Sequence, residues 1–479
     1  MNEFENGKCK TAVSDEIGRY LIAAKNLKQG DLLLCEQPVI IGPYWGSKLC
    51  CLTCYKRSSK ICKKCKLAPL CYGCDAHDDF ECNFLALAQL PKNFLIDNFD
   101  VITPLRCIIL SKNPCKAECY KQVMQMESHC SLRRGTKIWA LHESCVIKPL
   151  MDVALIREQE VDLVQKYCGI LDVNTFEVRT ESFEVFSGEI PIRGLYPTAA
   201  LLSHDCVSNT FIALDSTKSI RIYSSVDIAE GDPIWNNYTH ALSGTEVRRQ
   251  HLMEGKYFHC KCRRCLDPTE LGTNLSSIQC SDCENGMTMF HESLNKWKCN
   301  SCNNDKDIDD LMSLARSEIL EQEIGSVPML EQLIAKYSKL LNPNHYLVVD
   351  MKQKLTAILR SFCDHEPTPQ PKILQRKIML CEEILPILRV IQPGISRLTG
   401  IALYEYFNSM VELTIYNMNE KNISIQEGVD ELVRAETFAK ESLKMLLYEP
   451  KSTPEGHLAK SAMLKLKSIR ENICLFRKL

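Results

Sequence analysis

Residues 50–82 read CCLTCYKRSSKICKKCKLAPLCYGCDAHDDFEC and hold the densest run of potential metal donors in the chain. Three Cys-x2-Cys pairs begin at Cys51, Cys62 and Cys71, and His77 and Cys82 follow them. Tetrahedral Zn²⁺ takes four thiolate or imidazole donors, so these side chains suffice for two ions. Because so short a segment has almost no apolar core, metal binding must supply its folding free energy. The stretch therefore predicts a finger with two zinc ions.

Two further cysteine clusters follow later in the chain. Cys260, Cys262 and Cys265 supply three donors, so a structural zinc site there needs a fourth from elsewhere. The other cluster joins the pairs 280–283 and 299–302, a spacing typical of a zinc ribbon. Closed shells of four donors leave no open position for a catalytic water, so we expect all these sites to be scaffolds.

Composition sets the broad class of the protein. A chain of 479 residues is too long for one core, and 45% hydrophobic with 25% charged residues is ordinary for a globular protein. The net charge of −2 gives no chain-wide field for nucleic acid or membranes. No signal-peptide pattern and no apolar run near the roughly 20 residues of a membrane span is present. We therefore expect a soluble intracellular protein whose 27 cysteines stay reduced.

Hydrophobic patterning predicts an α+β fold. Residues 18–43 are typical of short strands broken by a turn at 28–31, and short strands return between 173 and 238. Residues 84–165 and everything after about 307 have helical periodicity. The paired helices of the C-terminal part favour either a tetratricopeptide-like array or an irregular bundle.

Three more segments, with the finger, resemble the SET and MYND domain-containing (SMYD) family of protein-lysine methyltransferases. Residues 18–43 resemble the opening of a SET domain, and residues 201–209, LLSHDCVSN, resemble its NHSCxPN motif. Residues 230–238, EGDPIWNNY, resemble its GEEL-x5-Y motif, and the post-SET cysteines follow. Residues 169–178, GILDVNTFEV, and the ribbon are most similar to the arthropod branch. The order of these motifs is more specific than any one of them.

The resemblance implies a SET-domain β-fold that is split by the finger and by a helical insert. The implied parts are a SET N-terminal part at 1–49, a MYND zinc finger at 50–83, a helical SET insert at 84–165, a SET core at 166–258, a post-SET zinc segment at 259–270, a zinc ribbon at 271–306 and a helical, tetratricopeptide-like domain at 307–479.

The resemblance also assigns the zinc ligands. One finger ion takes Cys51, Cys54, Cys71 and Cys74, and the other takes Cys62, Cys65, His77 and Cys82. Cys206 becomes the fourth donor beside Cys260, Cys262 and Cys265, while the ribbon uses Cys280, Cys283, Cys299 and Cys302. The x4 gap from His77 to Cys82 places them on diverging faces of one helix. Either that helix is kinked or Asp78 replaces His77, and Cys50 is an alternative to Cys51.

The implied reaction moves a methyl group from S-adenosylmethionine to a protein lysine. Tyr238 matches the catalytic tyrosine of the family, and Tyr196 is expected to line the channel for the target lysine. Phe258 is expected beside the adenine. The other implied cofactor-binding residues are Gly18, Arg19, Tyr20, Asn174, Ser203 and His204.

Departures from the family pattern leave two functions open. Tyr20 stands where active members have glycine, Ser203 replaces an asparagine and Ser208 replaces a proline. The first function is a lysine methyltransferase acting on histone or other protein in transcriptional regulation. The alternative is a degenerate SET/MYND adaptor that recruits partners.

The resemblance also implies partners and a cellular location. We expect a monomer in nucleus and cytoplasm whose finger binds proline-containing peptides or co-repressors. The basic run from Lys56 to Lys66 is typical of a solvated face, so direct nucleic-acid binding is not expected.

Overall fold

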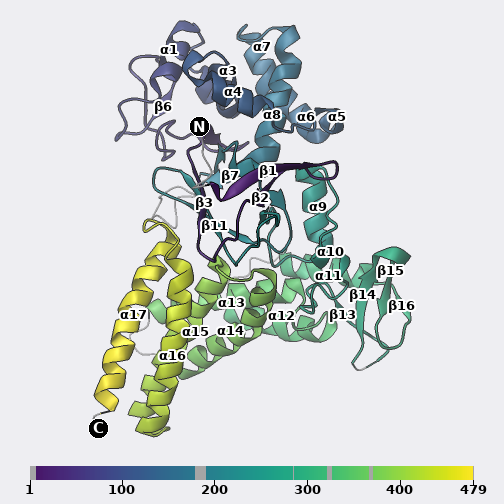
Figure 1. Ribbon diagram of the computed structural model, residues 1–479, viewed down its shortest axis with the longest axis vertical. Helices are drawn as coiled ribbons and strands as arrows, with labels where there is room; N and C mark the ends of the chain where they lie inside the picture. The colour runs from purple at the N-terminus through teal and green to yellow at the C-terminus, as the bar shows by residue number, and fades with distance from the viewer. Residues whose placement is uncertain (1–6, 179–189, 284, 321–325, 366–369, 478–479) are drawn as a thin grey trace.

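A computed structural model describes residues 7–178, 190–283, 285–320, 326–365 and 370–477. Figure 1 shows three tiers along the long axis, with the finger and helical insert at the top and long C-terminal helices at the bottom. Small β-sheets form the middle tier, and the ribbon projects to one side. The middle tier therefore contacts both of the others.

Short strands that are far apart in the sequence build the middle tier. One sheet pairs β1 (Cys9–Ser14) with β2 (Gly18–Ala23). Another has the order β10 (Thr210–Leu214), β11 (Ile220–Ser224), β3 (Leu32–Glu36), and a third has the order β4 (Ile40–Pro43), β8 (Ile192–Leu195), β7 (Thr175–Val178). Burial alternates along β11, as in a strand with one face on a core. The turn predicted at 28–31 lies between β2 and β3, where Gly30 has a φ of +90°.

A two-residue parallel pair brings the two SET-like motifs together. In it β9 (Ser203–His204) runs beside β12 (Trp235–Asn236). The side chain of Asn209 fastens the same junction, because its Oδ1 accepts from Trp235 N at 2.7 Å. Its Nδ2 donates to Pro233 O at 2.9 Å. Segments about thirty residues apart are thus held in one register.

The top tier combines the finger with the helical insert. The finger contains the short pair β5 (Lys60–Ile61) and β6 (Pro69–Leu70). The insert consists of α1 (Asp79–Leu87), α2 (Phe94–Asp97), α3 (Ile102–Ser111), α4 (Ala117–Met124), α5 (Cys130–Arg133), α6 (Lys137–His142), α7 (Lys148–Asp152) and α8 (Val161–Asn174). Because α3 is buried along nearly its whole length, it forms the core of this tier. Helix α8 runs directly into β7, so helical structure extends past residue 165 to Asn174.

Helices and one small sheet form the rest of the chain. After α9 (Thr245–Lys256) and α10 (Arg263–Leu266), the ribbon has the strand order β13 (Ile278–Gln279), β14 (Met287–His291), β15 (Lys296–Cys299), β16 (Asp305–Lys306). The bottom tier contains α11 (Asp309–Leu320), α12 (Val327–Leu340), α13 (Tyr346–His365), α14 (Pro371–Ile391), α15 (Arg397–Asn419), α16 (Ile425–Leu446) and α17 (Pro454–Phe476). Among the described residues, no helix combines the length and the apolar character needed to cross a membrane.

The turn between α14 and α15 docks the bottom tier on the middle one. Ile395 N donates to Ser225 O at 2.9 Å, and Arg397 donates to Ile212 O at 3.3 Å. Gly394 has a φ of +75°, and an added Cβ would lie 1.8 Å from Ser225 O. Only glycine fits this approach of two backbones.

Candidate metal centres and active site

The structure gathers the predicted metal donors into four separate groups. Within each group the four donor atoms all lie within 4.8 Å of one another. Sulfurs bound at 2.3 Å to one tetrahedral zinc ion lie about 3.8 Å apart. Sulfur–sulfur distances in the structure agree with that value, for example 3.5 Å for Cys54–Cys71, 3.8 Å for Cys62–Cys82 and 3.9 Å for Cys206–Cys260. The groups are Cys51, Cys54, Cys71 and Cys74; Cys62, Cys65, His77 and Cys82; Cys206, Cys260, Cys262 and Cys265; and Cys280, Cys283, Cys299 and Cys302.

The second finger group contains His77 rather than Asp78. Helix α1 begins at Asp79, so His77 precedes the helix and the divergence of positions i and i+5 does not apply. Asp78 is the N-cap residue, and its side chain accepts from Glu81 N at 2.9 Å. His77 Nε2 lies 3.4 Å from Cys65 Sγ. No kink is needed, because the chain turns at the cap.

Glu81 orients the imidazole from behind. Its Oε1 lies 2.8 Å from His77 Nδ1, which leaves Nε2 free for the metal. Arg106 from α3 donates to the same carboxylate through Nε at 2.6 Å. Burial alone would raise the pKa of Glu81. The charge of Arg106 and these hydrogen bonds outweigh burial and lower that pKa to about 2. The carboxylate is therefore charged, as a partner of a zinc-bound histidine should be.

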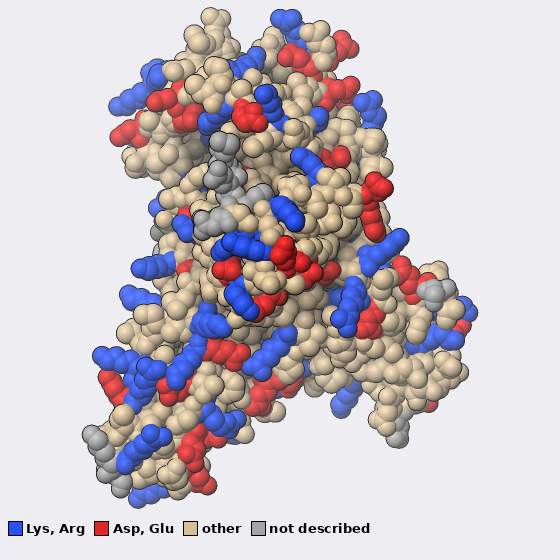
Figure 2. Space-filling model, viewed as in Figure 1, with Lys and Arg blue, Asp and Glu red and all other residues tan. Residues whose placement is uncertain are grey.

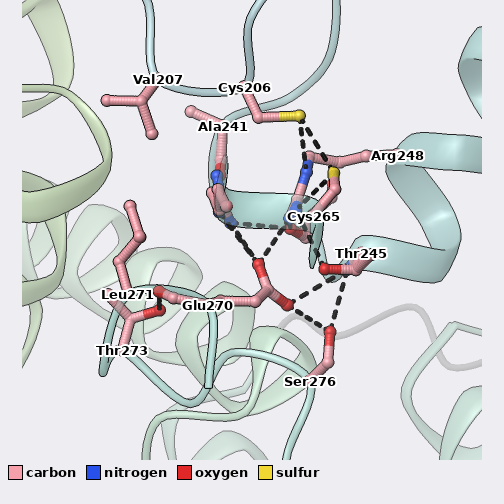
Figure 3. A network of polar contacts seen from close by, with 12 residues as sticks. Cys206, Val207, Ala241, Thr245, Arg248, Cys265, Glu270, Leu271, Thr273 and Ser276 are labelled. Carbon is pink, nitrogen blue, oxygen red and sulfur yellow. Dashed lines mark hydrogen bonds and ion pairs between the residues drawn. The ribbon is translucent and has the colours of Figure 1, made fainter. Parts of the chain in front are cut away.

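A buried arginine supports the group that Cys206 completes. Arg248 from α9 donates through Nε to Cys206 Sγ at 3.3 Å and through Nη2 to Cys265 Sγ at 3.4 Å. Figure 3 shows its guanidinium between these sulfurs and the carboxylate of Glu270. Four thiolates and one Zn²⁺ carry a net charge of −2, so a buried cation beside them offsets part of it.

Glu270 connects this arginine to the start of helix α9. Its Oε2 accepts from Arg248 at 2.7 Å and from Arg264 at 2.9 Å. Its Oε1 accepts from Thr245 N and from Ser276 Oγ. Thr245 opens α9, so the carboxylate also caps that helix. Sequence spacing carries no signal for this network.

The two SET-like motifs meet at His204. Its Nδ1 accepts from Tyr238 N at 3.0 Å, and its Nε2 lies 3.3 Å from Cys206 Sγ. Its ring also lies 5.2 Å from the ring of Tyr238 and 5.8 Å from the ring of Phe258. One histidine therefore joins a zinc group to a cluster of half-buried aromatic rings.

The hydroxyl of Tyr238 points inward and donates to Leu202 O. Removal from water raises the pKa of this phenol well above its usual value. The hydroxyl is therefore neutral, and its one proton is donated to Leu202 O. The predicted catalytic residue lies among the motif residues, and its catalytic role stays a prediction.

Several predicted cofactor residues converge on the loop at 125–129. Arg19 donates to Gln125 O at 2.8 Å, and Asn174 Nδ2 donates to Glu127 O at 2.8 Å. On the same loop the ring of His129 lies 5.0 Å from that of Tyr257, the neighbour of Phe258. Gly18 has a φ of +76°, and an added Cβ there would meet open space.

Three further predicted residues have contacts of their own in the structure. Tyr196 is fully buried, its hydroxyl donates to Lys218 O at 2.6 Å, and its ring packs against Phe176. Among the described residues no hydrogen bond or ring contact joins it to Tyr238, so its channel role stays a prediction. Ser203 pairs with Trp235 in β9, and Tyr20 pairs with Ala12 in β2.

Sequence reasoning missed Lys256, the last residue of α9. Its Nζ donates to Val173 O, next to Asn174, and lies 5.3 Å from the ring centroid of Tyr238. Removal from water lowers the pKa of this amine to about 8. A basic residue in the last turn of a helix is usually solvated, so the pattern gave no sign of this position.

The donor set around Tyr238 fits an S-adenosyl cofactor. The rings of His204 and Phe258 offer a surface for a purine, and Oδ1 of Asn174 can accept a hydrogen bond, while its Nδ2 donates to Glu127 O and Ile170 O. The cation of Arg19 suits a carboxylate. A nearby cavity of about 180 Å³ is lined by Asn236, Asn237 and Thr239, which flank Tyr238, and by residues of the α14–α15 turn.

Comparison with known proteins finds relatives that carry SET and MYND domains. The chain is 25% identical over 306 residues to the SET domain-containing protein SmydA-8, isoform A, of Drosophila melanogaster, covering 60% of this chain and 63% of that protein. It is 26% identical to N-lysine methyltransferase SMYD2-A of Xenopus laevis, covering 53% and 60%. It is 22% identical to histone-lysine N-methyltransferase SMYD3 of Mus musculus, covering 52% and 59%. The match thus spans about three fifths of these relatives.

Other comparisons add little. No family model matches the chain. The solved structure of Rubisco LSMT bound to AdoMet aligns over 98% of this chain and 90% of that chain at 10% identity, but its TM-score of 0.31 is too low to inform fold or reaction. The expected likeness to the arthropod branch agrees with the Drosophila protein. Motif order, the four groups of donors and these relatives together show that the chain is similar to SET and MYND domain-containing (SMYD) proteins.

Proposed function

We propose that the protein is an S-adenosylmethionine-dependent protein-lysine methyltransferase. The observation that carries the proposal is the junction of β9 and β12, where His204, Tyr238 and Phe258 meet beside the Cys206 zinc group. The names of two relatives as lysine methyltransferases support it.

Methyl transfer needs the protein to align the cofactor methyl with the lysine amine, and it needs no covalent bond to the protein. A bound cofactor supplies a methyl group made electrophilic by its sulfonium. In this proposal the Tyr238 hydroxyl, whose proton is donated to Leu202 O, uses its oxygen lone pairs to orient the attacking amine. His204 holds the backbone of Tyr238 in place through its Nδ1.

A target lysine must also lose its proton before it can attack. The effect of this site on an amine can be read from Lys256, whose pKa falls from its usual range to about 8 because its Nζ is removed from water. A substrate lysine entering beside Tyr238 meets the same desolvation, so its neutral form is favoured.

Calorimetric titration of the purified zinc-loaded chain with S-adenosylmethionine tests the proposal. We expect a single site per chain with a dissociation constant below about 100 μM. S-adenosylhomocysteine should compete for it. Absence of binding at millimolar cofactor would defeat the methyltransferase proposal, and the adaptor alternative would stand.

The substrate is proposed to be a histone or another protein, in transcriptional regulation in nucleus and cytoplasm. The cavity beside Asn236 and Asn237 supports a protein substrate, because residues of the C-terminal helices, among them Gln392 and Arg397, share its wall. Figure 2 shows positive and negative side chains interspersed over one face, which suits protein contacts better than a nucleic-acid backbone.

An adaptor function is the second candidate, and an exposed residue of the finger favours it. Tyr72 is 82% exposed and lies between the donors Cys71 and Cys74. Aromatic surfaces of this kind dock proline-containing peptides. Fluorescence anisotropy with a labelled proline-rich peptide should show binding that Tyr72→Ala weakens at least fivefold. Lys64→Ala, at another exposed position of the finger, should leave that binding unchanged.

A further inference from the structure

Lys256 differs from the other buried or half-buried lysines in its surroundings. Lys352 and Lys377 lie in the helical tier and pair with Glu383 at 2.5 Å and Glu405 at 2.8 Å. Among the described residues, no carboxylate forms an ion pair with Lys256 Nζ. The carboxylate that raises the pKa of Lys256 is that of Asp172, which is already paired with Arg133 and Arg193 at 3.1 Å each. Within the described part of the chain, Lys256 therefore has no counter-ion in hydrogen-bonding range.

The position of this amine is instead that of a reactant. Its Nζ is held by Val173 O at the end of α8, directly before Asn174, and it lies on the ring face of Tyr238. The next residues along the chain are Tyr257, which contacts His129, and Phe258, which contacts His204. The amine thus lies beside residues that the proposed function assigns to the cofactor.

We propose that Lys256 is itself a methyl acceptor, modified within the same chain by the cofactor bound at this site. The inference rests on the proposed methyltransferase function and adds a modification site to it. The neutral amine donates its lone pair to the methyl carbon, and the carbon–sulfur bond breaks with its electron pair left on sulfur. The products are a methylated ammonium at Lys256 and a neutral thioether, and the ammonium then releases one proton to solvent.

The electronic state of the amine suits this role. Desolvation favours the neutral, nucleophilic form, which an exposed lysine reaches only near its free pKa of about 10.4. The bound sulfonium adds a like charge nearby and favours the neutral form further. The aromatic face of Tyr238 can stabilise the methylated ammonium through a cation–π interaction.

Peptide mass spectrometry tests the site directly. The full zinc-loaded chain is incubated with S-adenosylmethionine that carries a trideuterated methyl, then digested. We expect the label on Lys256, at a fraction that does not change when the protein is diluted, as a reaction within one chain requires. Tyr238→Phe should lose the label, and Lys166, a half-buried lysine whose Nζ donates to Met124 O at 3.2 Å, should stay unlabelled.

Cofactor binding gives a second readout that needs no turnover. Calorimetry compares S-adenosylmethionine with S-adenosylhomocysteine, which lacks the positive charge, in wild type, Lys256→Met and Lys166→Met. If Nζ faces the sulfonium, Lys256→Met should improve the preference for S-adenosylmethionine about fivefold or more. Lys166→Met should leave that preference unchanged.

The outcomes separate the two proposals. If the cofactor binds but Lys256 stays unlabelled, or if Lys256→Met weakens both ligands equally, the acceptor role is wrong and the proposed function stands. Equal weakening would assign the amine to the carboxylate shared by both ligands. If neither ligand binds the wild-type chain, the proposed function fails, and the acceptor role fails with it.

Discussion

At the scale of single residues, the hydroxyl of Tyr238 is the atom whose loss is most informative. Tyr238→Phe keeps the ring contacts with His204 and Lys256 but removes the donor to Leu202 O. In the proposed mechanism the hydroxyl acts on the aligned reactants, so we expect turnover to fall at least about 100-fold. Cofactor affinity should change less than about twofold.

Cys206→Ser provides the contrasting variant for that measurement. It removes a zinc donor, so both cofactor affinity and turnover should fall together. Single-turnover kinetics with calorimetry on the same samples separate the two effects. Equal behaviour of the two variants would contradict a catalytic role for the Tyr238 hydroxyl.

The charge of Lys256 makes stability depend on pH in a predictable direction. The groups that act on this amine are Asp172 of α8, His129, His204 and the face of Tyr238. Its folded pKa of about 8 is below the unfolded value, so between these values the unfolded chain binds more protons. Stability due to this residue is therefore lost below about pH 8 and recovered as the pH rises towards about 10.

Thermal unfolding of wild type and Lys256→Met across this range measures the effect. We expect wild type to gain about 1 kcal/mol relative to Lys256→Met between about pH 8 and pH 10. Lys377→Met, which removes a lysine paired with Glu405, should show the opposite trend or none. A difference that does not vary with pH would mean that Lys256 keeps an ordinary pKa.

At the scale of elements, the residues at the N-terminus of α1 stabilise the second zinc site of the finger. Glu81→Gln removes the charge that orients His77 and pairs with Arg106. We expect the second finger site to lose zinc about 10- to 100-fold more readily. Competition with a chromophoric chelator measures it, and Asp75→Asn, which breaks only an exposed pair with Lys60, is the matched control.

Helix α9 depends on the buried pair of Arg248 and Glu270. Arg248→Met leaves the Cys206 and Cys265 thiolates without their donor and should cost about 3 kcal/mol. Glu270→Gln should cost a similar amount, and the double variant should cost less than the sum of the two. Glu246→Gln, in an exposed pair with Arg316, should cost less than about 1 kcal/mol in the same thermal melts.

Local patterns predicted some of these elements and missed others for physical reasons. Cys-x2-Cys pairs are recognisable from local spacing, so spacing alone indicated donors for two finger ions and for the ribbon site, while the division of the finger donors into two groups came from the resemblance. The part played by His77 was undecided, because it depends on where α1 begins, and the cap at Asp78 sets that point. Lys256, Arg248 and Glu270 were missed because their partners lie on distant segments.

At the scale of the whole molecule, zinc content tests the four groups together. We expect about four zinc ions per chain by elemental mass spectrometry, two in the finger, one with Cys206 and one in the ribbon. Removing them should unfold the finger and ribbon first, because these segments have little other core. A count of two or fewer in carefully prepared protein would contradict this assignment.

The pairing of β3 with β11 has a consequence for how the chain is made. Leu34 lies opposite Ile222, so the ribosome must synthesise the finger, the insert and β8 before β3 has its neighbour. At 5–20 residues per second that wait is roughly 10–40 s. During it the apolar strand is exposed to chaperones and to other nascent chains, while the finger can already close on its zinc. Translation speed and the supply of zinc thus act together on the yield of correctly folded protein.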